Sequence, residues 1–204
     1  MASLGEAEQN RAMDPVTLTS ERLLLRPVGP HDTDAVCEAC QDPEIQRWTT
    51  IPSPYLREHA VGFTEQMVPD GWADGSMFTF GVFLPAGGEL AGMLGITMLS
   101  PGVGEIGFWT TKEHRGNGYI TEAAVRASRW AFKDMAIDRV EWRAEVGNRG
   151  SRAVAERAGF TVEGVLRSGI NNKGVRRDCW IGSLLPSDMR LPSTAPYLPA
   201  PQHA

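Results

Sequence analysis

Hydrophobic and polar residues alternate without a break from Arg139 to Val146, as in a strand with one buried face. A longer period appears from Ile120 to Met135, where small and apolar residues recur every three or four positions, which is typical of one face of an α-helix. Before this helix, residues 105–111 are rich in β-branched and aromatic side chains, which favour a strand. The turn between them contains Gly116 and Gly118. This stretch therefore predicts a strand, a glycine turn and a helix.

The same patterns predict the other elements of the chain. Further strands are expected over residues 18–26, 77–84, 89–99, 161–170 and 175–185, and further helices over residues 30–40, 56–67 and 148–158. A loop is expected at Asp70–Gly75. The polar leader 1–16 and the proline-rich tail 189–204 are expected to be disordered, on either side of a single domain over residues 17–188.

Composition narrows the class of protein. The chain has 204 residues, 42% hydrophobic and 22% charged, which suits one globular domain with a sizeable core. A net charge of -5 argues against general nucleic-acid binding. No apolar run reaches membrane-spanning length and the N-terminus lacks the pattern of a signal peptide, so a cytoplasmic location is expected. Cys37 and Cys40 have no second ligand pair nearby, which favours buried thiols over metal binding or redox chemistry.

The glycine turn before the helix has the makings of an anion site. The first N–H groups of a helix have no intrahelical acceptor, and the aligned peptide dipoles place positive potential there. Gly116 and Gly118 permit a tight backbone turn, and Arg115 is expected to add a cation, so a pyrophosphate is the natural ligand. The alternative is an ordinary loop. Neither GxxxxGK with Ser or Thr nor GxGxxG is present, which disfavours the nucleoside triphosphate and dinucleotide folds.

Three separate motifs resemble one known family. The run Arg115-Gly-Asn-Gly-Tyr-Ile120, followed by Thr-Glu-Ala, resembles the coenzyme A pyrophosphate loop Q/R-x-x-G-x-G/A of the GNAT acetyltransferases, with Ile120 where the family usually has Gly or Ala. The opening TSERLLLRPV and the segment from Asn148 through Gly159-Phe160 resemble the RimJ/RimL branch, which includes acetyltransferases of ribosomal-protein N-termini. Together the matches extend from about residue 18 to residue 188.

The resemblance implies a fold and a cofactor. The fold would be α/β (α+β), with a mixed, mostly antiparallel seven-stranded sheet splayed at the cofactor strand and flanked by about four helices. Acetyl-CoA would lie in the splay and no metal would be needed. The implied cofactor contacts are Phe108, Trp109 and Thr110 along the pantetheine, Arg115, Gly116, Asn117, Gly118, Tyr119 and Ile120 at the pyrophosphate, and Asn148 and Ser151 on the next helix. Asn148 also suits the role of helix cap.

The implied chemistry is the attack of an amine on a thioester carbonyl, through an oxyanion that a backbone N–H of the cofactor strand can stabilise. Glu105 occupies the position of the glutamate base in histone-type relatives and is the candidate proton acceptor; the alternative is a carboxylate that only faces solvent. The tyrosine that many relatives use to protonate the leaving thiolate is replaced by Ala155. Ser151 is the candidate substitute, and hydrogen bonding within its own helical turn is the alternative.

The acceptor pocket is the least patterned part of the sequence. Its candidates are Trp48, Trp72, Arg167 and Asp178, although core packing explains tryptophans equally simply. The favoured function is N-acetylation of an α-amine on a protein N-terminus, a peptide or an aminoacyl compound. Two alternatives remain: acetylation of a small amine such as an antibiotic, and a non-catalytic coenzyme A-binding regulatory module. Since relatives are often dimers, the resemblance also leaves a homodimer open.

Overall fold

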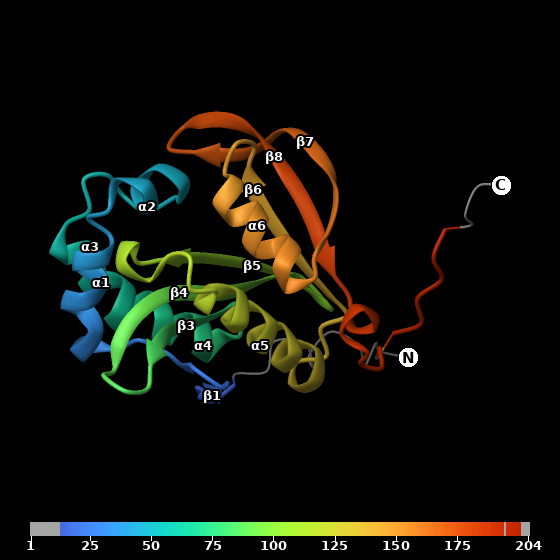
Figure 1. Cartoon of the computed structure of the whole chain (residues 1–204), viewed down its shortest axis with the longest axis horizontal. Coiled ribbons are helices and arrows are strands. Elements are labelled where there is room, and N and C mark those ends of the chain that lie inside the picture. The colour runs from blue at the N-terminus through green and yellow to red at the C-terminus, as the bar shows by residue number, and fades with distance from the viewer. Residues whose placement is uncertain (1–12, 194, 201–204) are drawn as a thin grey trace, which may run out of the picture.

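The computed structural model describes residues 13–193 and 195–200. Within them one eight-stranded sheet has the order β1-β2-β3-β4-β5-β6-β8-β7 (Figure 1). The strands are β1 (Leu18–Thr19), β2 (Leu24–Arg26), β3 (Met77–Leu84), β4 (Glu89–Ser100), β5 (Val103–Thr110), β6 (Arg139–Glu145), β7 (Thr161–Asn172) and β8 (Val175–Leu184). The predicted class, a mixed and mostly antiparallel sheet with flanking helices, is confirmed, with one strand more than predicted.

The helices occupy the connections between strands. They are α1 (Thr33–Ala39), α2 (Pro43–Trp48), α3 (Arg57–Gly62), α4 (Val68–Asp74), α5 (Tyr119–Asp134) and α6 (Arg149–Ala158). A π-helical turn η2 (Phe63–Met67) joins α3 to α4, and the described residues also form the 3₁₀ turns η1 (Pro30–Asp32), η3 (Lys112–His114) and η4 (Pro186–Met189).

The first predicted strand, over residues 18–26, is in fact two short strands. The Ser20 N–H donates to the Leu23 carbonyl at 3.0 Å, and this turn separates β1 from β2. β1 and β2 then pair antiparallel, with Leu18 opposite Leu25. The turn buries Leu23 almost completely, so the apolar run is explained by burial as well as by strand formation.

Two helices differ from the sequence expectation. α4 forms where a loop was predicted at Asp70–Gly75, because its Trp72 is buried in the core and Gly75 ends the helix with a positive φ of 71°. α2 was not predicted at all. Its local signal is present, since Asp42 caps the helix by accepting the Glu44 N–H at 2.9 Å and Pro43 occupies the first helical position.

The sheet opens between its two central strands. β5 and β6 are parallel and pair only from Val103–Arg139 to Ile106–Trp142. Beyond this point residues 107–110 of β5 remain paired with β4, whereas residues 143–145 of β6 remain paired with β8. The two halves of the sheet therefore diverge after Ile106 and Trp142, as predicted for a sheet splayed at this strand.

The two faces of the sheet differ in character. On one face Trp72 of α4 and Trp130 of α5 both contact the rings of Phe78 and Phe80, with centroids 5.1 to 5.6 Å apart. α6 lies beside α5 (Figure 1), and its Ser151 contacts Trp142 on the same face of β6. The opposite face of β6 carries the alternating charged residues Arg139, Glu141, Arg143 and Glu145.

The packed region extends beyond the predicted domain limits of residues 17–188. Met13 and Val16 pack against the core before it, and Met189 and Leu191 pack against it after it. The remainder of the predicted leader, residues 1–12, lies outside the described residues.

Candidate functional site

The loop between β5 and α5 has the backbone that the glycine pattern predicted. Gly116 and Gly118 have φ values of 80° and 76°, which favour glycine, and Gly118 caps α5. The first hydrogen bond of the helix runs from the Glu122 N–H to the Gly118 carbonyl at 3.0 Å, so the N–H groups of residues 119–121 have no acceptor within the helix. A Cβ at Gly116 would meet no other atom within 4 Å among the described residues. Open space before unpaired helix N–H groups fits a pyrophosphate.

Arg115 is not placed as predicted. Its guanidinium forms an ion pair with the Asp42 carboxylate and lies 3.4 Å from the Thr110 carbonyl. The expected free cation for the anion site is therefore already engaged with the N-cap of α2. Arg115 joins the glycine loop to α2 instead.

Arg22 supports the loop from outside, and sequence reasoning missed it. Its Nε donates to Glu122 Oε2 at 2.8 Å, its Nη1 donates to the Asn117 carbonyl at 3.1 Å, and its guanidinium lies 4.9 Å from the centroid of the Tyr119 ring. Although burial raises the pKa of Glu122, hydrogen bonds from Ser20 and Arg22 hold it below its usual range. A cation thus neutralises the carboxylate in the first turn of α5.

The open edge of β5 comprises Phe108, Trp109 and Thr110. They pair with Leu94, Met93 and Gly92 of β4, and they lie beyond the end of the β5–β6 ladder. Their other edge therefore faces the splay. An extended ligand arm can hydrogen-bond to such an edge as a further strand would.

The start of α6 lies next to the point where the sheet opens. Asn148 accepts the Ser151 N–H at 3.1 Å, which is the helix-cap role. The indole Nε1–H of Trp142 donates to Ser151 Oγ at 3.0 Å. Because Trp142 is the last β6 residue paired with β5, Ser151 is held at the beginning of the splay on the helix-covered face. The indole uses a lone pair of the hydroxyl and leaves its proton available for donation.

Glu105 lies on the opposite face at almost the same level. It pairs with Thr97 of β4 and Glu141 of β6, one residue before the end of the parallel ladder. Its side chain is 32% exposed, so it is not a fully solvated carboxylate. Burial raises the pKa of Glu105; the cation of Arg143 opposes the rise, and the charge of Glu141 adds to it. A raised carboxyl pKa makes a stronger base.

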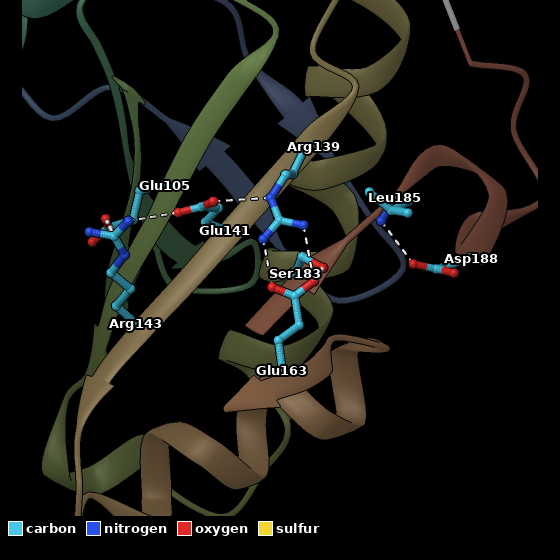
Figure 2. Close-up of polar contacts among 8 residues, drawn as sticks. All are labelled: Glu105, Arg139, Glu141, Arg143, Glu163, Ser183, Leu185 and Asp188. Carbon is cyan, nitrogen blue, oxygen red and sulfur yellow. Dashed lines mark hydrogen bonds and ion pairs between the residues drawn. The ribbon is translucent and has the colours of Figure 1, made fainter. Parts of the chain in front are cut away.

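A ladder of alternating charges extends from Glu105 across the sheet (Figure 2). Arg143 Nε lies 3.6 Å from Glu105 Oε2, while Arg143 Nη2 donates to Glu141 at 2.9 Å. Arg139 donates to the other oxygen of Glu141 at 3.0 Å and forms two bonds with Glu163, at 3.0 and 2.6 Å. The hydrogen bonds from Arg139 are the main reason that the pKa of Glu163 is lowered.

The residues predicted to line the acceptor pocket differ in burial, from a core position to exposed positions. The prediction for Trp72 is wrong: this side chain is 1% exposed and its Nε1 donates to the Thr79 carbonyl at 3.1 Å, so it is a core residue. Trp48 is half-buried, lies within 3.8 Å of a Cβ built at Gly147, and donates to Glu44 at 3.0 Å. Arg167 and Asp178 are exposed on the β7–β8 hairpin.

α2 connects the two halves of the molecule across the splay. Arg47 binds Glu145 at the end of β6 through two bonds of 2.9 and 2.6 Å, and these bonds lower the pKa of Glu145. The tip of the β7–β8 hairpin approaches the same helix (Figure 1), where Asn172 Nδ2 donates to the Arg47 carbonyl at 3.2 Å. With the Asp42–Arg115 pair at its other end, α2 links the glycine loop to the hairpin. Sequence patterns carry no signal for these long-range pairs.

Other chemistries find less support within the described residues. No group of three or more His, Cys, Asp and Glu side chains there is arranged to hold a metal ion. No helix in that part of the chain is long and apolar enough to cross a membrane. Cys37, Cys40 and Cys179 are free, and burial raises the pKa of Cys40 to about 12, so its thiol stays protonated at neutral pH.

Comparison with known proteins agrees with this geometry. The family model described as "Acetyltransferase (GNAT) domain" matches residues 22–161. "Putative ribosomal N-acetyltransferase YdaF" of Bacillus subtilis is 31% identical over 81% of this chain and 92% of that protein. "Uncharacterized N-acetyltransferase p20" of Bacillus licheniformis is 29% identical over 83% of this chain and 96% of that protein. The solved structure of Mycobacterium smegmatis RimJ with CoA-disulfide shares the fold, with a TM-score of 0.79, 22% identity, and coverage of 87% of this chain and 92% of that chain.

Proposed function

The chain belongs to the GNAT acetyltransferase family, and from this premise we propose that it acetylates the α-amine of a protein N-terminus, a peptide or an aminoacyl compound. It is an acetyl-CoA-dependent acyltransferase of the RimJ/RimL-like branch. Acetyl-CoA supplies the acetyl group as a thioester. The acceptor is the part that we propose.

Names of relatives support an α-amine on a protein. The relative with 31% identity carries a ribosomal N-acetyltransferase name, and a structural neighbour at 21% identity is titled "Ribosomal L7/L12 alpha-N-protein acetyltransferase". At 21% identity, the similarity between the two structures shows a shared fold only. The proposal for this chain therefore depends on its own site.

The observation that carries the proposal is the placement of Glu105 and Ser151. They lie at the start of the splay on opposite faces of the sheet, Glu105 beside the last ladder residues of β5 and Ser151 bonded to Trp142. We assign Glu105 to accept the proton of the acceptor amine, directly or through water, and Ser151 to donate a proton to the leaving sulfur. The open backbone edge of residues 108–110 would orient the substrate and donate hydrogen bonds to its carbonyl oxygen.

The strength of this base suits an α-amine. An α-amine has a reference pKa of about 7.7 and a lysine side chain of about 10.4, so at neutral pH a substantial fraction of the former is already neutral, against about a thousandth of the latter. The difference corresponds to roughly 3.7 kcal/mol that the site need not supply. A single carboxylate whose pKa is raised by burial is adequate for the α-amine.

The acceptor class can be tested by free-thiol release from acetyl-CoA. The panel contains peptides with a free α-amine, the same peptides with a blocked N-terminus, aminoacyl analogues, aminoglycosides and polyamines. We expect turnover on free N-termini and loss of turnover when the α-amine is blocked. Turnover confined to aminoglycosides or polyamines would replace the α-amine with the small-amine alternative.

Replacing Ser151 by alanine should lower kcat about tenfold while the KM for acetyl-CoA changes little, because the variant loses a proton donor but keeps the helix N-terminus. Steady-state kinetics with saturating peptide measure both constants. A matched control is Ser187→Ala in η4, far along the chain from α6, which should change neither. An unchanged kcat in Ser151→Ala would remove Ser151 from the proton transfer.

Replacing Arg22 by alanine should raise the KM for acetyl-CoA about threefold to fivefold with little change in kcat, since the Asn117 carbonyl loses a donor and Glu122 loses its countercharge beside the anion site. Initial rates at varied acetyl-CoA measure this. Arg126→Ala is the control, because Arg126 lies on α5, the helix that also carries Glu122, and donates to the Thr19 carbonyl. Equal KM values in the two variants would contradict the supporting role of Arg22.

A further inference from the structure

The immediate surroundings of Glu105 contain two charged residues with opposite influence. Both Arg143 and Glu141 come from β6 and share the face of the sheet on which Glu105 lies. From β8 the Cys179 thiol is close enough to interact electrostatically, but burial raises its pKa and keeps it neutral at assay pH. From β4 the paired residue is Thr97, which does not titrate. Burial therefore has the largest influence on the pKa of Glu105, and Arg143 and Glu141 are the charged groups that adjust it.

The two contacts of Arg143 are unequal. Its Nη2 is 2.9 Å from Glu141 Oε2, a good charge-assisted hydrogen bond, whereas its Nε is 3.6 Å from Glu105 Oε2, too far for one. Arg143 Nε has no hydrogen-bond partner among the described residues. The cation therefore lies near Glu105 but is directed toward Glu141.

Glu141 is itself held firmly. Arg139 Nε donates to Glu141 Oε1 at 3.0 Å, and the remaining nitrogens of Arg139 bind Glu163, which also accepts the Ser183 hydroxyl at 2.7 Å (Figure 2). The side chain of Glu141 is only 13% exposed. A carboxylate fixed in this way can hold Arg143 in one orientation.

We propose that Arg143 and Glu141 are positioning residues that act together as an electrostatic brace for Glu105. Glu141 draws the guanidinium of Arg143 away from a direct hydrogen bond with Glu105, and the nearby cation still keeps Glu105 ionised at neutral pH. The carboxylate is thereby left free to take a proton. This inference rests on the proposed role of Glu105 as proton acceptor.

The brace predicts opposite effects from its two members. Glu141→Gln removes a negative charge near Glu105 and releases Arg143 toward it, and both changes favour the ionised form, so the pKa of Glu105 should fall. Arg143→Gln removes the cation, so the pKa should rise. The expected size is about one pH unit in each direction, at the lower end of the range for a charge within 4–6 Å of a carboxyl group.

Two measurements test the brace on the whole protein. The first is the ¹³C NMR titration of labelled glutamate carboxyls, with the Glu105 signal assigned by its loss in Glu105→Gln. The second is the acid limb of the pH dependence of kcat with a free-α-amine peptide, whose own titration is the same for every variant. Because the rate needs ionised Glu105, the limb should move to lower pH in Glu141→Gln and to higher pH in Arg143→Gln. Arg143→Lys keeps the positive charge, so its Glu105 pKa and its acid limb should lie close to those of the wild type.

Arg57→Gln is the matched control, since it removes one arginine from an exposed pair with Asp34 and should move neither titration. Shifts in the same direction, or no shift of the Glu105 signal in either variant, would overturn the brace even if Glu105→Gln abolishes the limb. Opposite shifts of the signal with an unmoved kinetic limb would instead overturn the role of Glu105 as base. The two failures are thus distinguishable.

Discussion

Replacing Glu105 by glutamine should lower kcat/KM at neutral pH roughly 100-fold, within the usual range for the loss of a general base. Glutamine keeps the size and hydrogen-bonding capacity of the side chain but cannot accept a proton, and the neighbouring Arg143 keeps its ion pair with Glu141. Stopped assays of thiol release across pH should show the loss of the acid limb that belongs to the enzyme. The limb set by the substrate α-amine should remain.

A control for this variant is Glu156→Gln, which removes a carboxylate from an exposed pair with Arg152 on α6. It should retain wild-type rates and the wild-type pH profile. If Glu105→Gln matched the wild type in both rate and profile, Glu105 would be only a partly buried strand residue, and another group or water would have to receive the proton.

Replacing Gly118 by valine should raise the KM for acetyl-CoA about fivefold to thirtyfold. A β-branched residue is strongly disfavoured at a φ of 76°, at a cost of roughly 1 to 2 kcal/mol or more, and each 1.4 kcal/mol corresponds to about a factor of ten in affinity. The new side chain would also begin 3.8 Å from Nη2 of Arg22, which supports the loop. Calorimetric binding of coenzyme A measures the loss directly.

The control must separate backbone strain from loss of the anion site. Gly88→Val offers this, because Gly88 has a φ of 65° in the β3–β4 turn and no other described atom within 4 Å of a Cβ there. It should lower the melting temperature as Gly118→Val does, yet leave coenzyme A binding unchanged. Equal binding by the two variants would mean that the glycine loop is not the pyrophosphate site.

The parts of the fold that the sequence predicts well are those with a strong local period. The alternation in β6 and the apolar face of α5 follow from side chains that meet the same core, and the glycines at 116 and 118 follow from a backbone that only glycine adopts easily. α4 escaped prediction because Gly71 and Asp70 look like loop residues. The burial of Trp72 against aromatic rings from other elements outweighs that preference.

The site is less predictable because it depends on pairs that are distant in sequence. Arg22 and Glu122 are 100 residues apart, and Arg47 and Glu145 are 98 residues apart. A charged position on a strand or helix shows which face is solvated, but not which opposite charge will be folded against it. The same reason explains why Arg115 was expected at the pyrophosphate and was found with Asp42.

The most direct test of the proposed function is a competition within one substrate. A peptide with both a free α-amine and an internal lysine is incubated with the enzyme and acetyl-CoA near neutral pH, and tandem mass spectrometry locates the acetyl group. The proposal predicts acetylation at the N-terminus. In Glu105→Gln this acetylation should fall by the same factor as thiol release. Acetylation of the lysine alone, or of neither amine while a small amine is turned over, would contradict it.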